Sequence, residues 1–168
     1  LGGEPSEIVL DAGSDTVYVS DWTGGRLLLL DAQKLLEPTV LGAFVAGHFL
    51  QPETAAHRLI LAQSGTSQAS LVYRDGVTPL DLPAPAAAAV VHPSTGVSYV
   101  LIPSTNLLLA LAPDGAEFLR WTLPDRPEAI ALDATRDKLF VSMPAAGALA
   151  VIDVNTRAQY LIPPALVP

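Results

Sequence analysis

The sequence has no cysteine, and only 6% of its 168 residues are aromatic. Without cysteine the chain has no disulfide framework, no thiolate metal site and no cysteine nucleophile. Basic residues are also scarce: nine Lys and Arg stand against 17 Asp and Glu, giving a net charge of −8. Such a surface repels a phosphate backbone and anionic lipid, so we expect no nucleic-acid partner and no docking on an anionic membrane.

Long apolar runs are missing as well, although 50% of the residues are hydrophobic. No run approaches the roughly 18 residues of a membrane span, so no span is expected. High hydrophobicity with only 15% charged residues excludes a disordered chain. The sequence starts at Leu1 without a signal-type segment, so we expect a processed chain, an expressed piece or part of a longer polypeptide.

Catalytic signatures are absent too. The sequence contains no Gly-x-Ser-x-Gly elbow, phosphate-binding loop, Gly-x-Gly-x-x-Gly or His-Glu-x-x-His. We therefore assign no catalytic, cofactor-binding or metal-binding residue and expect no cofactor.

What the sequence does contain is a repeat. Residues 5–32, moved forward by 122 positions, fall without a gap on residues 127–154. The positions kept are Pro5, Ile8, Leu10, Asp11, Ala12, Asp15, Val19, Ser20, Gly25, Leu27 and Asp31, which recur as Pro127, Ile130, Leu132, Asp133, Ala134, Asp137, Val141, Ser142, Gly147, Leu149 and Asp153. Chance repeats apolar residues, but it does not also repeat turn residues in the same register.

Two further copies are expected between these, because 122 is three steps of about 41 residues. One lies at an offset of 81, where Tyr18 and Val19 recur as Tyr99 and Val100. The other fits only with small insertions, matching Leu50 to Leu10 and Ile60 to Tyr18. Its segment "ETAAHRLILAQ" is by itself compatible with a helix, but the period favours strands.

Each copy reads as four short strands bounded by Gly, Pro, Asp and Ser. The expected strands are 6–11, 16–21, 26–31 and 39–45; 47–52, 58–63, 69–74 and 77–82; 86–91, 97–102, 107–112 and 116–122; 128–133, 138–143, 148–153 and 157–162. The predicted fold class is therefore all-β: a β-propeller of four sequential four-stranded antiparallel blades, as a complete ring or as half or part of a larger one. The whole chain, 1–168, is predicted to be one propeller segment with blades at about 1–45, 46–82, 83–123 and 124–168. A β-sandwich is the structural alternative.

The segments "YVSDW", "LFVSM" and "AVIDVNT" follow "P-x-x-I-x-L-D" openings and resemble the YVTN family of propeller repeats; "VYVSDWTGGRLLLLDA" is also similar to an NHL repeat. The resemblance covers essentially the whole chain and is strongest in the first and fourth copies. It implies blades but no particular chemistry. Proteins with such repeats include bacterial surface and periplasmic propellers, subunits of amine and alcohol dehydrogenases, lactonases and interaction scaffolds.

Loops after the second and fourth strands of each blade are expected to gather on one face of a propeller. Their polar or aromatic members are candidate ligand-face residues: Asp21, Trp22, Arg26, Gln63, Ser64, Ser104, Asn106, Asp125 and Arg126. Together they offer hydrogen-bonding groups and one stacking surface to a polar ligand. The competing interpretation is that these residues cap their own tight turns.

Two other sets of residues suggest chemistry at first sight. His48 maps to the ligand face, but His57 and His92 map to turns at the other end of ~17–20 Å strands, so no shared metal ion is expected. Glu4, Asp21 and Asn106 resemble the ligands of the divalent ion in lactonase-type propellers. Copies two and four offer no further ligands, so no such ion is expected. The pairs Asp11/Asp15 and Asp133/Asp137 recur at equivalent positions, which favours turn residues over a catalytic dyad.

The resulting hypothesis is a non-catalytic binding or assembly module that mediates protein–protein interaction, periplasmic or extracellular. One alternative is part of a propeller enzyme, of lactonase or quinoprotein/amine dehydrogenase type, whose catalytic elements lie outside this segment; another is a purely structural subunit. Because the first blade begins and the last blade ends with the sequence, each end blade is expected to lack a neighbour on one side. The end blades are therefore expected to self-associate or to bind protein partners. The predicted end faces lie around Ile8, Val17, Tyr18 and Leu28, and around Leu139, Phe140, Val151 and Tyr160.

Overall fold

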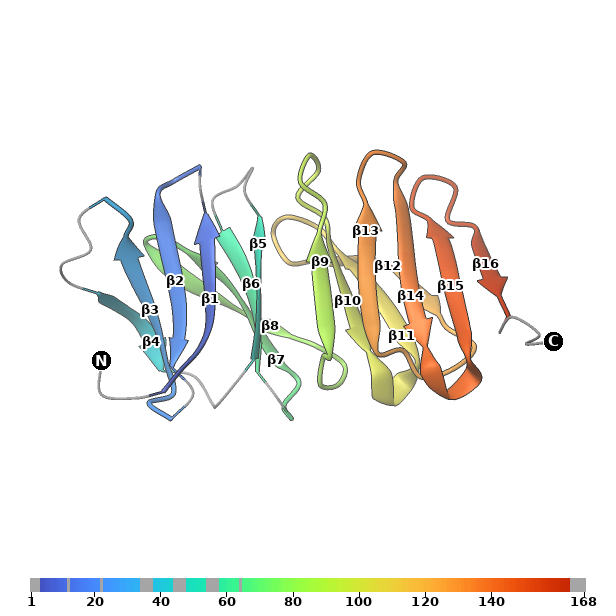
Figure 1. Ribbon diagram of the computed structural model, residues 1–168, viewed down its shortest axis with the longest axis horizontal. Helices are drawn as coiled ribbons and strands as arrows, with labels where there is room; N and C mark the ends of the chain where they lie inside the picture. Colours follow the sequence, from blue (N-terminus) through green and yellow to red (C-terminus); the bar gives the residue numbers. More distant parts are fainter. Residues whose placement is uncertain are drawn as a thin grey trace. The chain divides into compact units, whose positions relative to one another are not determined.

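A computed structural model of the chain describes residues 4–11, 13–21, 23–33, 38–43, 48–53, 58–63 and 65–163. Within these ranges the chain forms four antiparallel four-stranded sheets, each built from consecutive strands paired up and down (Figure 1). This confirms the predicted four-sheet all-β architecture and excludes the two-sheet sandwich. Residues 58–63, where a helix was also compatible with the sequence, form a strand. No helix among the described residues is long and apolar enough to cross a membrane.

We call the sheets blades 1 to 4. Blade 1 consists of β1 (Pro5–Asp11), β2 (Thr16–Asp21), β3 (Arg26–Asp31) and β4 (Thr39–Ala43); blade 2 of β5 (His48–Glu53), β6 (Arg58–Gln63), β7 (Gln68–Tyr73) and β8 (Gly76–Asp81). Blade 3 consists of β9 (Ala88–Val91), β10 (Ser98–Ile102), β11 (Leu107–Leu111) and β12 (Glu117–Thr122); blade 4 of β13 (Ala129–Asp133), β14 (Lys138–Met143), β15 (Ala148–Asp153) and β16 (Gln159–Ile162).

The chain divides into two compact units, residues 1–86 and 87–168, each holding two blades. Within the first unit β1 lies beside β5, and within the second β9 lies beside β13, so the first strands of the paired blades adjoin (Figure 1). All strands fall inside the blade ranges expected from the repeat. That the whole chain forms one propeller domain stays a prediction.

In the first unit, blades 1 and 2 pack face to face through an apolar cluster. Its buried members are Tyr18, Leu27, Leu29, Leu59, Leu61 and Val72, from β2, β3, β6 and β7. Tyr18 is only 1% exposed, and burial raises the pKa of its hydroxyl. Removing such side chains from water provides the main stabilisation of the unit, at roughly 1.5–3 kcal/mol for each large one.

In the second unit, blades 3 and 4 meet in a larger cluster. Its buried members are Tyr99, Leu101, Leu108, Ala110, Trp121, Leu123, Leu139, Val141, Met143, Ala150 and Ile152. The Trp121 indole N–H donates to the Arg157 carbonyl of blade 4 at 3.2 Å, a polar link across the same interface. The continuous apolar runs of the sequence thus belong to middle strands such as β10, of which every residue is buried.

The predicted end faces were wrong at two residues. Tyr18 and Leu139 lie in the two interblade clusters and are 1% and 0% exposed. The prediction combined neighbours such as Leu139 and Phe140, yet successive residues of a strand point to opposite faces. The register separates them: Ile8, Val19, Leu28 and Val40 form one cross-strand row of blade 1, and Ala131, Phe140, Val151 and Tyr160 form one of blade 4.

Turn geometry follows the repeat closely. In the first turns of blades 1, 3 and 4 the backbone is left-handed at Asp15 (φ 52°), Gly96 (φ 70°) and Asp137 (φ 53°). These positions are separated by the offsets 81 and 122 found in the sequence. Asp and Gly are among the residues that tolerate this conformation, which explains why the turn residues recur in register.

Candidate functional site

Asp21 and Arg26 face each other across the β2–β3 turn. The Arg26 guanidinium donates to Asp21 Oδ2 through Nη2 at 2.6 Å and Nε at 3.2 Å. The backbone N–H of Gly24 donates to Asp21 Oδ1 at 2.9 Å, and a Cβ on Gly24 would overlap the same carboxylate. The Arg26 hydrogen bond, followed by that of Gly24, lowers the pKa of Asp21. The pair thus holds its own turn together.

The second blade contributes Gln63, which is buried at the end of β6. Its carbonyl accepts hydrogen bonds from the backbone N–H and the hydroxyl of Thr66, both at 3.3 Å. Trp22 and Ser64, the remaining candidates of the first unit, lie outside the described residues.

In the second unit, Ser104 is exposed on the 3-10 turn η1 (Pro103–Thr105), and Asn106 ends that turn. Asn106 has φ 53°, donates its N–H to the Pro103 carbonyl at 3.3 Å and accepts from the Leu123 N–H at 2.8 Å. Blade 4 builds the same turn from η2 (Pro144–Ala146) and Gly147. Here Asn106 replaces a glycine at a left-handed position.

Asp125 and Arg126 follow β12 in the loop to the next blade. The Asp125 carboxylate accepts from the Arg126 backbone N–H at 2.7 Å, and Arg126 is exposed. Each unit therefore presents its own candidate residues, and the described carboxylates among them serve local turns. That these residues together form one ligand face stays a prediction.

Metal-binding geometry is not found among the described residues: no group of three or more His, Asp or Glu side chains is placed to hold an ion. His57 and the side chain of His48 lie outside the described part of the chain. The expectation about the three histidines is therefore not tested.

The first turns of blades 1 and 4 show what the repeated aspartates do. Asp11 accepts from the Gly13 N–H at 3.1 Å and from the Ser14 hydroxyl at 2.6 Å. Asp133 accepts from the N–H groups of Thr135 and Arg136, both at 3.1 Å. These are side-chain-capped turns, so the Asp11/Asp15 and Asp133/Asp137 pairs are turn residues, as expected.

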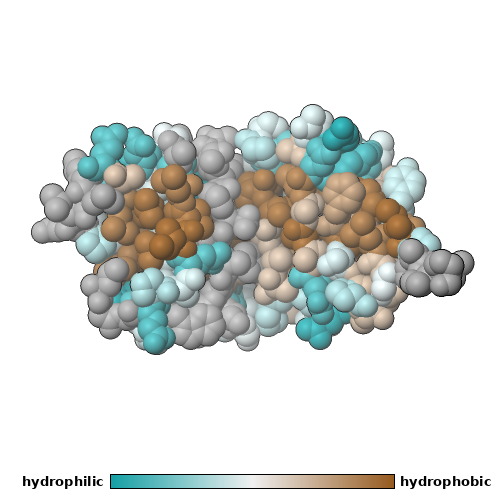
Figure 2. All heavy atoms as spheres, in the orientation of Figure 1, coloured by the Kyte–Doolittle hydropathy of each residue, from teal (hydrophilic) through white to brown (hydrophobic). Residues whose placement is uncertain are grey.

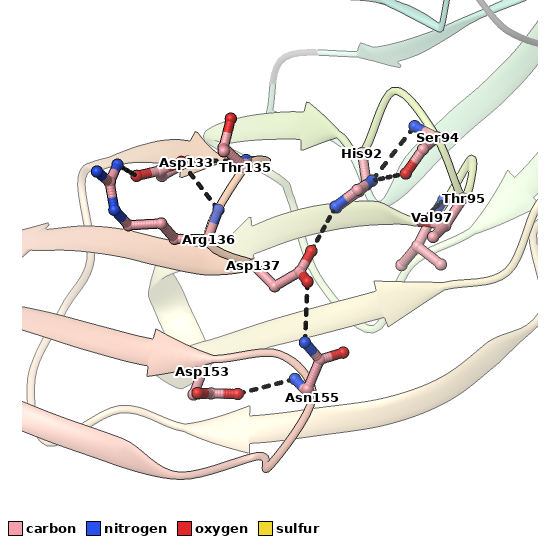
Figure 3. A network of polar contacts seen from close by, with 10 residues as sticks. All are labelled: His92, Ser94, Thr95, Val97, Asp133, Thr135, Arg136, Asp137, Asp153 and Asn155. Atoms are coloured by element: carbon pink, nitrogen blue, oxygen red, sulfur yellow. Dashed lines mark hydrogen bonds and ion pairs between the residues drawn. The ribbon is translucent and has the colours of Figure 1, made fainter.

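His92 stands at the same position of the third copy and caps its turn with an imidazole (Figure 3). Its Nδ1 accepts from the Ser94 N–H at 3.3 Å and lies 3.1 Å from the Ser94 hydroxyl. Its Nε2 lies 2.8 Å from Asp137 Oδ1 in blade 4. Since Nδ1 accepts the backbone N–H, Nε2 carries the proton that is donated to Asp137.

The order serine, histidine, aspartate is that of a hydrolytic triad, but this geometry is structural. Ser94 is only two residues from His92. In a triad the imidazole nitrogen accepts a proton from the serine hydroxyl alone, whereas here Nδ1 also accepts a hydrogen bond from the Ser94 backbone N–H. Asp137 Oδ2 also accepts from the Asn155 amide at 2.9 Å (Figure 3). The Asn155 bond, then the His92 bond, lowers the pKa of Asp137. His92, Asp137 and Asn155 therefore tie blade 3 to two turns of blade 4.

Asp153 caps the neighbouring turn of blade 4. It accepts from the Asn155 N–H at 3.0 Å and the Thr156 N–H at 2.8 Å, and forms an ion pair with Lys138. Lys138, followed by Thr156, lowers the pKa of Asp153 to about 2. Blade 4 thus carries three carboxylates with lowered pKa values, those of Asp133, Asp137 and Asp153.

These shifts predict acid sensitivity of the second unit. The folded pKa of Asp153 lies below its unfolded value of about 3.9, so its contribution to stability is complete above that pH. It is lost as pH falls from about 4 towards the folded pKa of about 2. We expect the thermal midpoint to fall through this window by more in the unaltered chain than in Asp153→Asn. Circular dichroism melts at pH 6, 4, 3 and 2 measure this, and parallel curves would contradict it.

Solved structures of other proteins are similar in fold to this chain. The sequence matches no known family model and no curated protein. Among solved structures, the dihydro-heme d1 dehydrogenase NirN aligns with a TM-score of 0.78 at 17% identity, over 97% of this chain and 38% of that chain. The β-propeller domain of Myceliophthora thermophila Cps50 (Swd1) aligns with a TM-score of 0.77 at 19% identity, over 98% of this chain and 56% of that one.

A third similar structure is Staphylococcus aureus virginiamycin B lyase, with a TM-score of 0.74 at 11% identity over 96% of this chain and 56% of that one. All three are β-propeller proteins. At such identities the likeness shows the fold alone: four blades of a β-propeller. The chain spans about 38–56% of the length of these structures.

Proposed function

We propose that the chain is a β-propeller segment of the YVTN/NHL repeat kind that acts as a non-catalytic binding or assembly module outside the cytoplasm. The supporting observation is where large apolar side chains remain exposed. On blade 1, Ile8 and Leu10 are 67% and 55% exposed; on blade 4, Tyr160 and Ile162 are 62% and 50% exposed. Contiguous apolar surface of this kind is typical of protein interaction sites.

The polar turns offer less to a partner. Asp21, Asp133 and Asp153 each accept several hydrogen bonds from their own turn or a cross-strand cation. A ligand would have to replace bonds that already stabilise the fold. Covering an exposed apolar strand replaces only water, which favours association.

Two of the similar structures are named as a dehydrogenase and a lyase, and this supports a second candidate function. In that alternative the segment belongs to a propeller enzyme of lactonase or quinoprotein type whose catalytic elements lie in other blades. Placement outside the cytoplasm rests on the likeness to periplasmic and surface propellers carrying YVTN repeats.

The two candidates predict opposite outcomes in the native host. We expect Tyr160→Lys combined with Ile162→Lys to dissociate the assembly that contains the chain, because two charges on the outer strand must be desolvated for it to form. The matched control, Asp125→Asn combined with Arg126→Ala, alters the polar loop and should leave the assembly intact. Native gels with quantitative mass spectrometry measure both. Loss of an enzymatic activity of the assembly when the loop pair alone is altered and the assembly stays intact would favour the enzyme.

A further inference from the structure

Two sheet faces, one on each end blade, are not part of the interblade clusters. The head face is the side of blade 1 turned away from blade 2, and consists of Ile8, Leu10, Val17, Val19, Leu28, Leu30 and Val40. Ile8, Leu10 and Val40 are exposed, whereas Val19 and Leu28, on the middle strands, are already buried in the single chain. The tail face is the side of blade 4 turned away from blade 3, and consists of Ala129, Ala131, Phe140, Leu149, Val151, Tyr160 and Ile162. Figure 2 shows apolar residues gathered over the blade 1 strands β1–β3.

The repeat shows what each face is shaped to meet. Phe140, Leu149 and Val151 of the tail face occupy the positions of Tyr18, Leu27 and Leu29, which pack blade 1 onto blade 2. In blade 3 the same positions are Tyr99, Leu108 and Ala110, which pack onto blade 4. The tail face is therefore the surface that binds a following blade.

The head face is the complementary surface. Its residues Val17, Val19 and Leu30 occupy the positions of Leu139, Val141 and Ile152, by which blade 4 packs onto blade 3. Ile8 and Leu10 match Ile130 and Leu132, which pack against the same cluster. The head face is thus the surface that would bind a preceding blade, and the tail face is the surface that would bind a following one.

The rim of the tail face carries Asp133 at the position of His92, paired with the cation Arg136. Within the second unit, the first turn of the preceding blade donates to Asp137 of the following blade through His92. Asp15 holds the equivalent position on blade 1, and only its Oδ2 is bonded by a described residue, Gln33, at 2.6 Å. The first turn of blade 4 carries Arg136, a cation whose side chain is 76% exposed. A guanidinium has donors beyond the one engaged with Asp133.

We propose that a second copy of the chain covers these faces head to tail, the tail face of each copy packing on the head face of the other. This rests on the proposed assembly function and names its partner. A two-fold axis relating the two copies would give two identical tail-to-head contacts, one at each head face. Two junctions also help the pair reach the roughly 1,600 Å² that stable interfaces bury.

The test uses one altered face at a time in the full chain. Ile8→Asp spoils the head face and keeps the tail, whereas Tyr160→Asp spoils the tail face and keeps the head. By light scattering at micromolar concentration we expect the unaltered chain at twice the mass of one chain, and each variant as a single chain with dimerisation weakened about tenfold or more. An equimolar mixture should regain a two-chain species, because one intact tail meets one intact head.

Phe118→Asp is the matched control, since Phe118 is 54% exposed on β12 and belongs to neither face; it should dimerise as the unaltered chain does. Circular dichroism confirms that each variant is folded. A dimer of Tyr160→Asp alone, or a mixture that stays single, would overturn the head-to-tail pairing. If the unaltered chain is folded and monomeric, a second copy does not cover the two faces. The proposed function would still stand in that case if Tyr160→Lys with Ile162→Lys dissociates the native assembly.

Discussion

Leu139→Ala is expected to lower the free energy of unfolding of the second unit by about 3 kcal/mol, whereas Phe140→Ala costs less than about 1 kcal/mol. Leu139 is fully buried between blades 3 and 4, so its removal leaves a cavity. Phe140 is the next residue of β14 and points to the tail face. The adjacent substitutions therefore separate core from interface in one strand.

Urea denaturation of the dilute chain, followed by tryptophan fluorescence, measures both. Trp121 lies in the same cluster as Leu139 and reports on it directly. Dilution matters because an assembled tail face would add association energy to the apparent stability of the unaltered chain. Equal losses at the two positions would show that the tail face is packed within the chain itself and would contradict the assignment of faces.

His92→Ala is the second substitution with a large expected effect, a loss of about 2 kcal/mol. It opens a gap at a side chain that is only 5% exposed and removes the acceptor of the Ser94 N–H and the donor to Asp137. His92→Asn should recover part of the loss, because a short amide also caps this kind of turn.

A double-mutant cycle with Asp137→Asn isolates the link between the blades. Asparagine tolerates the left-handed backbone at position 137, so the cycle reports the side-chain contact rather than backbone strain. We expect a coupling free energy between about 0.5 and 3 kcal/mol. Additive losses would mean that His92 acts only on its own turn.

Most of the fold follows from the sequence because the repeat fixes the turns. Along the gap-free offsets, Asp, Gly and Pro recur in register, and twelve of the sixteen expected strand ends in blades 1 and 4 coincide with the observed ones, while the other four differ by one or two residues. The largest shift among the described strand ends of these two blades is at β16, which starts two residues later than expected. Outer strands carry weaker signals because one edge lacks a partner.

The faces were harder to predict than the strands. Tyr18 and Leu139 lie in continuous apolar runs, in which no polar alternation marks the side turned to a neighbouring blade. Only the pairing register separates Leu139 from Phe140. The offsets of 81 and 122 contain this information, since equivalent positions should face the same way in every copy.

The polar network of His92, Asp137 and Asn155 was not predicted from the sequence, for a related reason. The repeat already places His92 at the position of Asp11 and Asp133, which marks it as a turn cap. Its bond to Asp137 spans two blades and depends on how they pack, which a turn pattern does not encode. Among the candidate ligand residues, the Asp21–Arg26 pair is local in sequence, so the capping interpretation was accessible from the start.

The central claim, that the apolar faces of the end blades are interfaces, is tested most directly by hydroxyl-radical footprinting of the assembly isolated from the native host. Ile8 and Tyr160, 67% and 62% exposed in the single chain, should be strongly protected in the assembly. Both should be labelled after the assembly is dispersed by dilution, and Ile8 also after it is dispersed by Tyr160→Lys with Ile162→Lys. Phe118, 54% exposed and on neither face, should be labelled equally in both. Labelling of Ile8 and Tyr160 at the same rate in the assembly and in the dispersed chain would contradict the claim.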